Sequence, residues 1–153
     1  MGAYLLFAVG FTAIHAAAYV LAGVVALAVS KDLYAAKDRV LDFLHDMSDP
    51  VESRHVQRTF LPAQLLRGLL MAVVLFPVLG ALSEMSFALR TVFFASLTFV
   101  YLEVASSIPF STNIEGYVYM KARYRRLPSV WKLYLEVILY SLLLGFAASW
   151  LLF

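Results

Sequence analysis

The sequence contains no cysteine and few charged residues. Of its 153 residues, 14% are charged and 63% are hydrophobic. The absence of cysteine excludes disulfides, thiolate catalysis, iron–sulfur ligation and cysteine-based zinc sites. A soluble domain carries about 25% charged residues, and a domain of this size buries only about 70% of its unfolded surface. One small soluble core cannot hide this apolar excess, so we expect a single domain surrounded by lipid over much of its surface.

Four apolar stretches are long enough to cross a membrane, since a span needs about 20 mostly apolar residues. The first stretch is too long for a cleaved signal peptide, and no Lys or Arg precedes it. The predicted fold class is therefore all-α: an antiparallel bundle of four transmembrane helices in one domain. The predicted spans cover about residues 3–29, 61–83, 86–108 and 130–153.

The first polar segment, about residues 30–60, shows two helical signals. Apolar residues recur at helical spacing in its first half, and Asp49-Pro50-Val51-Glu52 then has the pattern of a new helix start. We expect Pro62 to begin the second span, where its missing N–H costs nothing. The spaced apolar residues are Leu33, Ala36, Val40, Leu44 and Met47, interleaved with Lys37, Asp38, Asp42 and Asp46.

The second polar segment, about residues 109–129, also predicts a helix. Thr112 and Glu115 have capping-box spacing, which indicates a helix from Asn113 to about Arg126. Short amphipathic helices are therefore expected beside the four spans.

The basic residues predict the orientation, because basic loops are retained in the cytoplasm. Arg90 is the only Lys or Arg expected on the side opposite to both polar segments. Both polar segments are therefore predicted to be cytoplasmic and both termini to lie outside. The cytoplasmic set is Lys31, Lys37, Arg39, Arg54, Arg58, Lys121, Arg123, Arg125, Arg126 and Lys132.

Arg67, Glu103 and Glu136 form one predicted layer of charge inside the membrane. Each lies about six residues, or about 9 Å at 1.5 Å per residue, from the cytoplasmic face. Charged groups in a span usually face the bundle interior and pair. In one interpretation Arg67 bridges both carboxylates, with help from Lys132, and fixes the helix register. In the other, the layer is a polar pocket in which Glu103 or Glu136 acts as acid or base. A third possibility is that Arg67 faces lipid and reaches the headgroups.

His15 lies near the middle of the first span, with Tyr19 one turn further on. We expect a neutral histidine there to hydrogen-bond to a neighbouring helix; contact of His15 and Tyr19 with a ligand is the alternative. Haem ligation would need a second axial group, and no other histidine lies in a predicted span, so we expect no cofactor.

The segment from Tyr117 to Arg126 is basic and rich in tyrosine, which is typical of a membrane interface that attracts anionic headgroups. A sharper alternative is a phosphate site formed by Arg123, Arg125 and Arg126 together with Asn113. Nothing favours nucleic-acid binding. The acidic and histidine residues from His45 to His55 lack a metal-ligand spacing, so we expect no metal site.

No catalytic signature such as a Walker motif or a nucleophile elbow occurs. The leading expectation is a non-catalytic accessory subunit of a membrane complex, or a small homo-oligomer. The second is a membrane enzyme or binder for a lipid-linked or amphipathic anionic ligand at the cytoplasmic face. The third is a proton- or ion-coupled transporter formed by oligomerisation. An enzyme or binder requires a cavity that reaches the charged layer, whereas a scaffold requires none.

Overall fold

The computed structural model describes residues 2–35 and 39–153, and this part of the chain consists of helices and connecting turns without a β-strand. Four helices are long and apolar enough to cross a membrane. The long elements are α1 (Gly2–Val29), α3 (Pro50–Leu75), α5 (Phe87–Ser96) and α7 (Leu127–Leu151). The short elements are α2 (Lys31–Tyr34), η1 (Phe76–Val78), α4 (Leu79–Glu84), the π-helix η2 (Leu97–Val104), α6 (Ile114–Tyr119) and η3 (Ala122–Tyr124).

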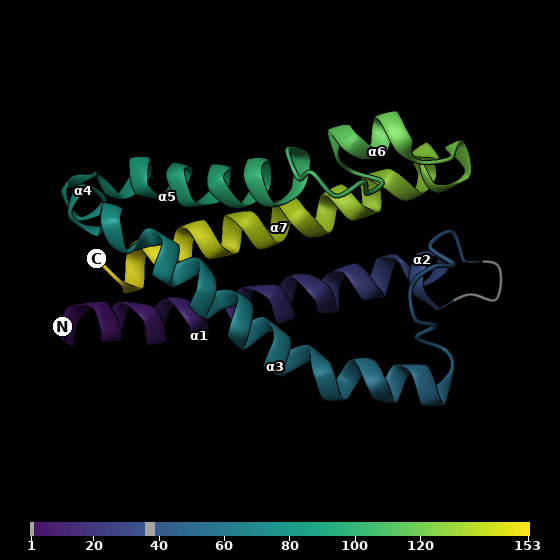
Figure 1. Cartoon of the computed structure of the whole chain (residues 1–153), viewed down its shortest axis with the longest axis horizontal. Helices are drawn as coiled ribbons and strands as arrows, with labels where there is room; N and C mark the ends of the chain where they lie inside the picture. The colour runs from purple at the N-terminus through teal and green to yellow at the C-terminus, as the bar shows by residue number, and fades with distance from the viewer. Residues whose placement is uncertain (1, 36–38) are drawn as a thin grey trace.

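Two helices, α1 and α7, occupy the centre of the molecule. They pack against each other, while α3 packs on α1 and α5 packs on α7. Both termini and α4 lie at one end, which we call the hairpin end, and α2 and α6 lie at the other, which we call the loop end (Figure 1). Toward the loop end α3 diverges from α5 and α7 (Figure 1).

Glycines permit the closest helix contacts. A Cβ atom on Gly68 of α3 would lie 3.0 Å from Thr12 Cα of α1, and one on Gly145 of α7 would lie 2.7 Å from the Thr91 oxygen of α5. Close backbone approach gains van der Waals contact, which is a main source of helix association in lipid. Gly68 and Gly145, which look isolated in the sequence, therefore join helices within the chain.

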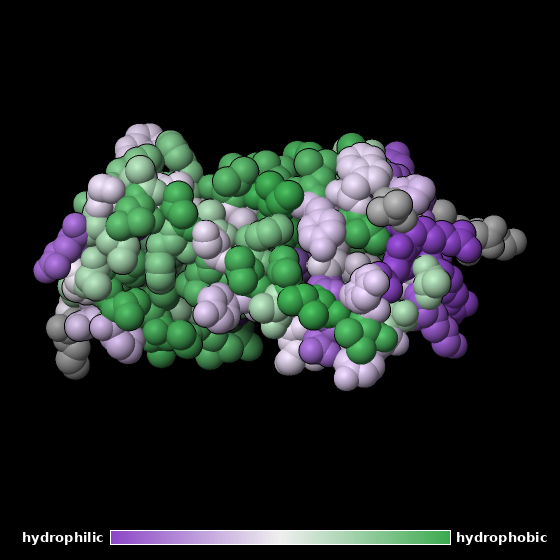
Figure 2. Space-filling model, turned by 90° about the horizontal axis from the view of Figure 1, so that it is seen from above, coloured by the Kyte–Doolittle hydropathy of each residue, from purple (hydrophilic) through white to green (hydrophobic). Residues whose placement is uncertain are grey.

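The core is divided between the two ends. The larger cluster contains Phe7, Phe11, Leu82 and Phe94 and extends along α1, α3, α5 and α7. A smaller cluster at the loop end joins Leu33 and Leu41 to Leu133 of α7. Hydrophobic residues cover most of the length of the surface, and hydrophilic residues gather mainly at the loop end (Figure 2).

The predicted helix over the first half of the first polar segment is wrong in its extent. Helix α2 ends at Tyr34, and turns follow from Val40 to Phe43; Ala36, Lys37 and Asp38 lie outside the described residues. The chain returns to α2 at Val40, whose N–H donates to the Asp32 oxygen at 3.4 Å, and Leu33 and Leu41 are both fully buried in one cluster with Leu133 of α7. The backbone N–H of Met47 then donates to the Tyr34 oxygen at 2.9 Å.

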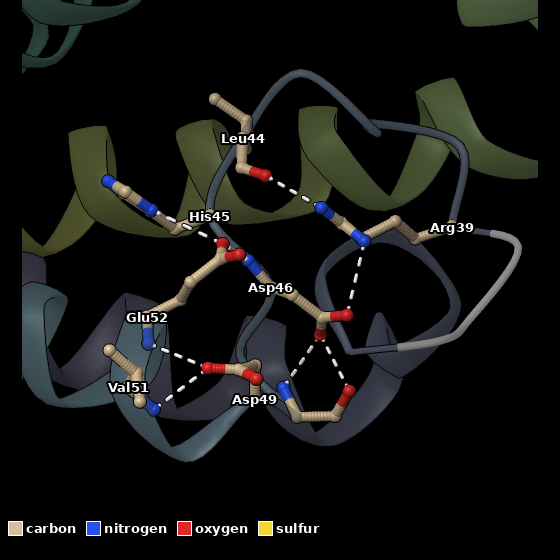
Figure 3. A network of polar contacts seen from close by, with 8 residues as sticks. Arg39, Leu44, His45, Asp46, Asp49, Val51 and Glu52 are labelled. Atoms are coloured by element: carbon tan, nitrogen blue, oxygen red, sulfur yellow. Dashed lines mark hydrogen bonds and ion pairs between the residues drawn. The ribbon is translucent and has the colours of Figure 1, made fainter.

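The predicted start of α3 is confirmed. The Asp49 carboxylate accepts from the N–H groups of Val51 (2.8 Å) and Glu52 (2.9 Å), and Pro50 is the first helical residue (Figure 3). The Glu52 carboxylate, however, accepts from the Asp46 N–H instead of closing a capping box. The same network includes Arg39, whose guanidinium donates to Asp46 at 3.1 Å and to the Leu44 oxygen at 2.9 Å (Figure 3).

Two other helix boundaries differ from the prediction. Pro62 does not begin a helix but lies inside α3, which runs unbroken from Pro50. The third span ends at Val104, four residues before the predicted end, because the helix widens into a π-helix and the chain turns at Ala105.

The predicted helix from Asn113 to about Arg126 is likewise shorter. Asn113 caps α6, which ends at Tyr119, and a single 3₁₀ turn follows. The Asn113 side chain accepts from Gly116 N–H at 2.7 Å and donates to the Ile108 oxygen at 2.6 Å. These bonds make a compact turn that a longer helix would have to open.

Candidate functional site

Two adjoining cavities open between the helices toward the loop end. The larger, which we call the groove, has a volume of about 680 Å³ and lies between α1, α3 and α7 under the first polar segment. The smaller, which we call the recess, has a volume of about 70 Å³. Tyr19, Glu103, Glu136 and Val137 line both cavities. The groove and the recess therefore lie on either side of the same side chains.

The recess contains the charged layer. Arg67 from α3, Glu103 from η2 and Glu136 from α7 all line it. The structure thus brings together the three residues that the sequence places at one depth. It does not join them as ion pairs, because within the described residues no nitrogen of Arg67 lies within 4.0 Å of a carboxylate oxygen.

Glu136 is held by a tyrosine. The Tyr34 hydroxyl of α2 donates to Glu136 Oε2 at 3.2 Å. Burial, followed by the negative charge of Glu136, raises the pKa of the Tyr34 hydroxyl above its usual range, so this hydroxyl remains a donor. Lys132, expected to assist this layer, instead lies 2.6 Å from Asp32. The folded polar segment therefore reaches into the site and positions Glu136.

Glu103 depends on the π-helix. It lies in the last turn of η2, where the Ala105 N–H donates to the Val100 oxygen five residues earlier. Wide turns of this kind occur frequently at functional sites, since they rotate a side chain out of the regular helical register. The Thr112 hydroxyl donates to Glu103 Oε1. Tyr134 of α7 in turn donates to the Thr112 backbone oxygen at 2.6 Å, which fixes the loop that holds Glu103.

Arg67 lies over an aromatic ring. Its guanidinium carbon is 5.6 Å from the centroid of Tyr19, a cation–π distance. The Tyr19 ring also meets Tyr140 edge-on at 5.3 Å and Phe60 at 5.8 Å. Tyr19 therefore forms the boundary between the recess and the groove and supports the positive charge there.

His15 is fully buried behind this boundary. Its Nδ1 lies 2.7 Å from the Tyr140 hydroxyl and its Nε2 lies 3.3 Å from Gln64 Oε1. Because an amide oxygen only accepts, Nε2 carries the proton and Nδ1 accepts from Tyr140. The expected hydrogen bonding of His15 to neighbouring helices is therefore confirmed, and both ring nitrogens are occupied.

The groove is mainly apolar. Its polar side chains are Gln57 from α3 and the tyrosine and glutamate residues described above. Gly23 of α1 also lines it, and a Cβ atom there would meet no heavy atom within 4 Å. The apolar lining comes from Val20, Val24, Ala26, Leu27, Leu44, Met47, Val56, Phe60, Phe110, Leu133 and Val137.

The predicted phosphate-binding arginines lie elsewhere. Arg123 pairs with Asp42 at 3.5 Å and stacks on Tyr124, and Arg125 stacks on Tyr117. Arg126 is an exposed residue at the start of α7. None of these three arginines is among the lining residues of the groove or the recess, nor is Asn113, whose side chain closes its own turn.

Sequence reasoning missed four residues of the site: Tyr34, Gln64, Thr112 and Tyr140. Tyr140 lies one turn after Glu136, and Gln64 lies one turn before Arg67, so helical spacing places each on the face of a predicted charge. Tyr34 and Thr112 carry no such signal, because they come from segments whose folding back depends on tertiary contacts.

No family model, curated protein or solved structure matches this chain. The class of protein therefore follows from its own structure: an all-helical chain with four helices long and apolar enough to span a membrane. Its distinguishing feature is an apolar groove that adjoins a charged recess.

Proposed function

We propose that this protein is a multi-pass membrane protein that binds an amphipathic molecule at its cytoplasmic face. The apolar chain of the ligand lies in the groove and its polar head enters the recess. The observation that carries this proposal is that Tyr19, Glu103 and Glu136 line both cavities. An amphipathic molecule binds best where an apolar surface adjoins a polar one.

The membrane placement rests on hydropathy and on charge. Four helices reach the length and apolar character of a span, and a band of hydrophobic surface extends between the two ends (Figure 2). The described basic residues of both polar segments lie toward the loop end, which supports a cytoplasmic position for that end. In this arrangement the four helices form an antiparallel bundle with both termini outside.

The alternatives require different features. An accessory subunit needs no cavity, and a homo-oligomer or a partner subunit remains a prediction that the single chain does not test. A transporter needs a path beyond the recess toward His15, but His15 is fully buried and Tyr140, which lines the recess, donates to it. The use of Glu103 or Glu136 as a catalytic acid or base also remains a prediction, since no reacting group is identified.

The proposal is tested by filling the groove. Gly23→Phe places a ring where a Cβ atom meets no heavy atom within 4 Å, so the helix is expected to fold while the groove loses volume. Gly80→Phe in α4 is the matched control, because Gly80 is also unobstructed but lies at the hairpin end.

The readout is native mass spectrometry of the full chain released from a membrane, with retained small amphiphiles counted. We expect the wild type and Gly80→Phe to keep a bound amphiphile and Gly23→Phe to lose most of it. Equal retention by all three proteins would show that the groove is not the binding site and would refute the proposal.

A further inference from the structure

The charges of the recess do not balance. Two carboxylates, Glu103 and Glu136, share it with one guanidinium, that of Arg67. When all three are ionised, the recess lacks one positive charge. Lys132, the basic residue nearest to Glu136 in the sequence, forms an ion pair with Asp32 at 2.6 Å instead. A charge deficit of this kind in a partly buried site is costly unless a partner supplies the missing charge or one carboxyl group takes up a proton.

The two carboxylates also have acceptor capacity left. A carboxylate offers about four lone-pair sites on two oxygens. Glu136 accepts from Tyr34 through Oε2, and Glu103 accepts from Thr112 through Oε1. Among the described residues, no hydrogen bond reaches the second oxygen of either group. Both side chains are half-buried, and neither second oxygen is enclosed by protein, so both can accept hydrogen bonds from a group that enters the recess.

The size and the surroundings of the recess restrict what it receives. Its volume of about 70 Å³ holds only a few water molecules, since one needs about 10–15 Å³. Tyr19 and Val137, which line the recess, also line the apolar groove. The missing group must therefore be small, positively charged, rich in N–H donors and attached to an apolar chain.

We infer that the ligand is a cationic amphiphile with a primary ammonium head, which donates hydrogen bonds to Glu103 and Glu136 while its chain lies in the groove. This inference rests on the proposed function and specifies its ligand. It replaces the anionic head expected from the sequence, because Arg123, Arg125 and Arg126 do not line the site. Charge-assisted hydrogen bonds of this kind are about twice as strong as neutral ones.

Four probes with the same sixteen-carbon chain separate the contributions of the head. They are hexadecylamine, hexadecyltrimethylammonium, hexadecanol and palmitate. The first two carry the same charge, but only the amine has N–H donors. Affinities are measured by titrating the full-length protein in a non-ionic detergent near pH 7. We expect the amine to bind at least about tenfold more tightly than each other probe, about 1.4 kcal/mol.

Variants locate the effect. Glu103→Gln and Glu136→Gln keep the side-chain size but remove the charge, and each should reduce the preference for the amine over hexadecanol about tenfold. Glu84→Gln is the control, because Glu84 is an exposed carboxylate at the end of α4, remote from both cavities. The control should retain the wild-type preference.

The possible failures are distinct. If palmitate binds most tightly, or if the amine and hexadecanol bind equally, the inference about the head is overturned while binding in the groove stands. If Glu103→Gln and Glu136→Gln retain the full preference for the amine, the recess is not the site of the head. If no sixteen-carbon probe binds at all, the proposed function itself is refuted.

Discussion

The hairpin end and the loop end differ in how firmly the long helices are joined. At the hairpin end α4 and α5 are separated only by Met85 and Ser86. Phe7 and Phe11 of α1 belong there to the same main core cluster as Phe94 of α5. At the loop end α3 departs from α5 and α7 (Figure 1). The space left there is the groove, closed partly by Tyr34, Leu44 and Met47 of the first polar segment.

This difference shows how connection length creates a site. A two-residue link holds neighbouring helices together, whereas the segment between Val29 and Pro50 is long enough to let α3 diverge. The extra loop-closure entropy of a longer link grows only slowly with its length. The chain can therefore keep a closed end and an open end without a large cost in stability.

The strongest test of the closed end is Gly145→Ala. Its Cβ atom would lie 2.7 Å from the Thr91 oxygen and 3.0 Å from the Ala95 backbone nitrogen, so α5 must move away. Overpacking of this kind costs about 1–3 kcal/mol, and we expect a lower midpoint of thermal unfolding in detergent.

Gly80→Ala is the matched control for this substitution. It replaces a helical glycine with open space around it, and alanine is favoured over glycine in a helix by about 1 kcal/mol. We expect no loss of stability. If Gly145→Ala is as stable as Gly80→Ala, the close packing of α5 on α7 does not hold the closed end together.

At the loop end, the start of α3 is tested by Asp49→Ala. Loss of the cap leaves the N–H groups of Val51 and Glu52 without their acceptor and costs about 1 kcal/mol. Amide hydrogen exchange at these two residues should become about fivefold faster, while exchange in the centre of α7 should not change. Asp49→Asn keeps the accepting oxygen and should restore slow exchange; equally fast exchange in this variant would argue against capping.

The hydrogen bond between α1 and α7, which lies between the two ends, is tested by Tyr140→Phe. The change removes the hydroxyl that donates to His15 Nδ1 but keeps the ring that packs on Tyr19. Hydrogen bonds between membrane helices contribute about 0.6 kcal/mol on average, so the unfolding midpoint should fall slightly. A loss as large as that of Gly145→Ala would mean that this bond holds α1 to α7 as strongly as the close contact of Gly145 holds α5 to α7.

The smallest expected effect concerns the turn before α3 (Figure 3). Hydrogen bonds from the Ser48 hydroxyl and backbone N–H, with the charge of Arg39 as a further cause, lower the pKa of Asp46 below its usual value. A lowered pKa means that the ionised carboxylate stabilises this turn above the ordinary aspartate pKa of about 3.9. That stabilisation is lost as the pH falls through the lower, folded value.

The measurement is the Ser48 amide chemical shift followed by NMR between about pH 2 and pH 6. We expect its midpoint below the pKa of a model aspartate, and no such titration in Asp46→Asn. A midpoint at or above the model value would contradict the proposed hydrogen-bonded turn.

Helical periodicity and charge accounted for much of this structure in advance. Asp49 and Pro50 correctly marked the start of α3, since capping depends on residues adjacent in the chain. The common depth of Arg67, Glu103 and Glu136 was also readable, because helical rise is uniform. The partners were not readable: Arg67 meets Tyr19 and pairs with neither carboxylate among the described residues, and Lys132 pairs with Asp32.

The sequence by itself determined four helices able to span a membrane, the cap of α3 and the approximate height of each charge in the recess. All of these depend on interactions between residues close in the chain. Only the tertiary structure decided that α3 diverges, that η2 widens to carry Glu103, and that Tyr34 folds back to Glu136. These features depend on contacts between residues far apart in the sequence, such as those of Leu33 and Leu41 with Leu133. Because local spacing carries no information about such contacts, the groove and its charged recess became visible only in the folded chain.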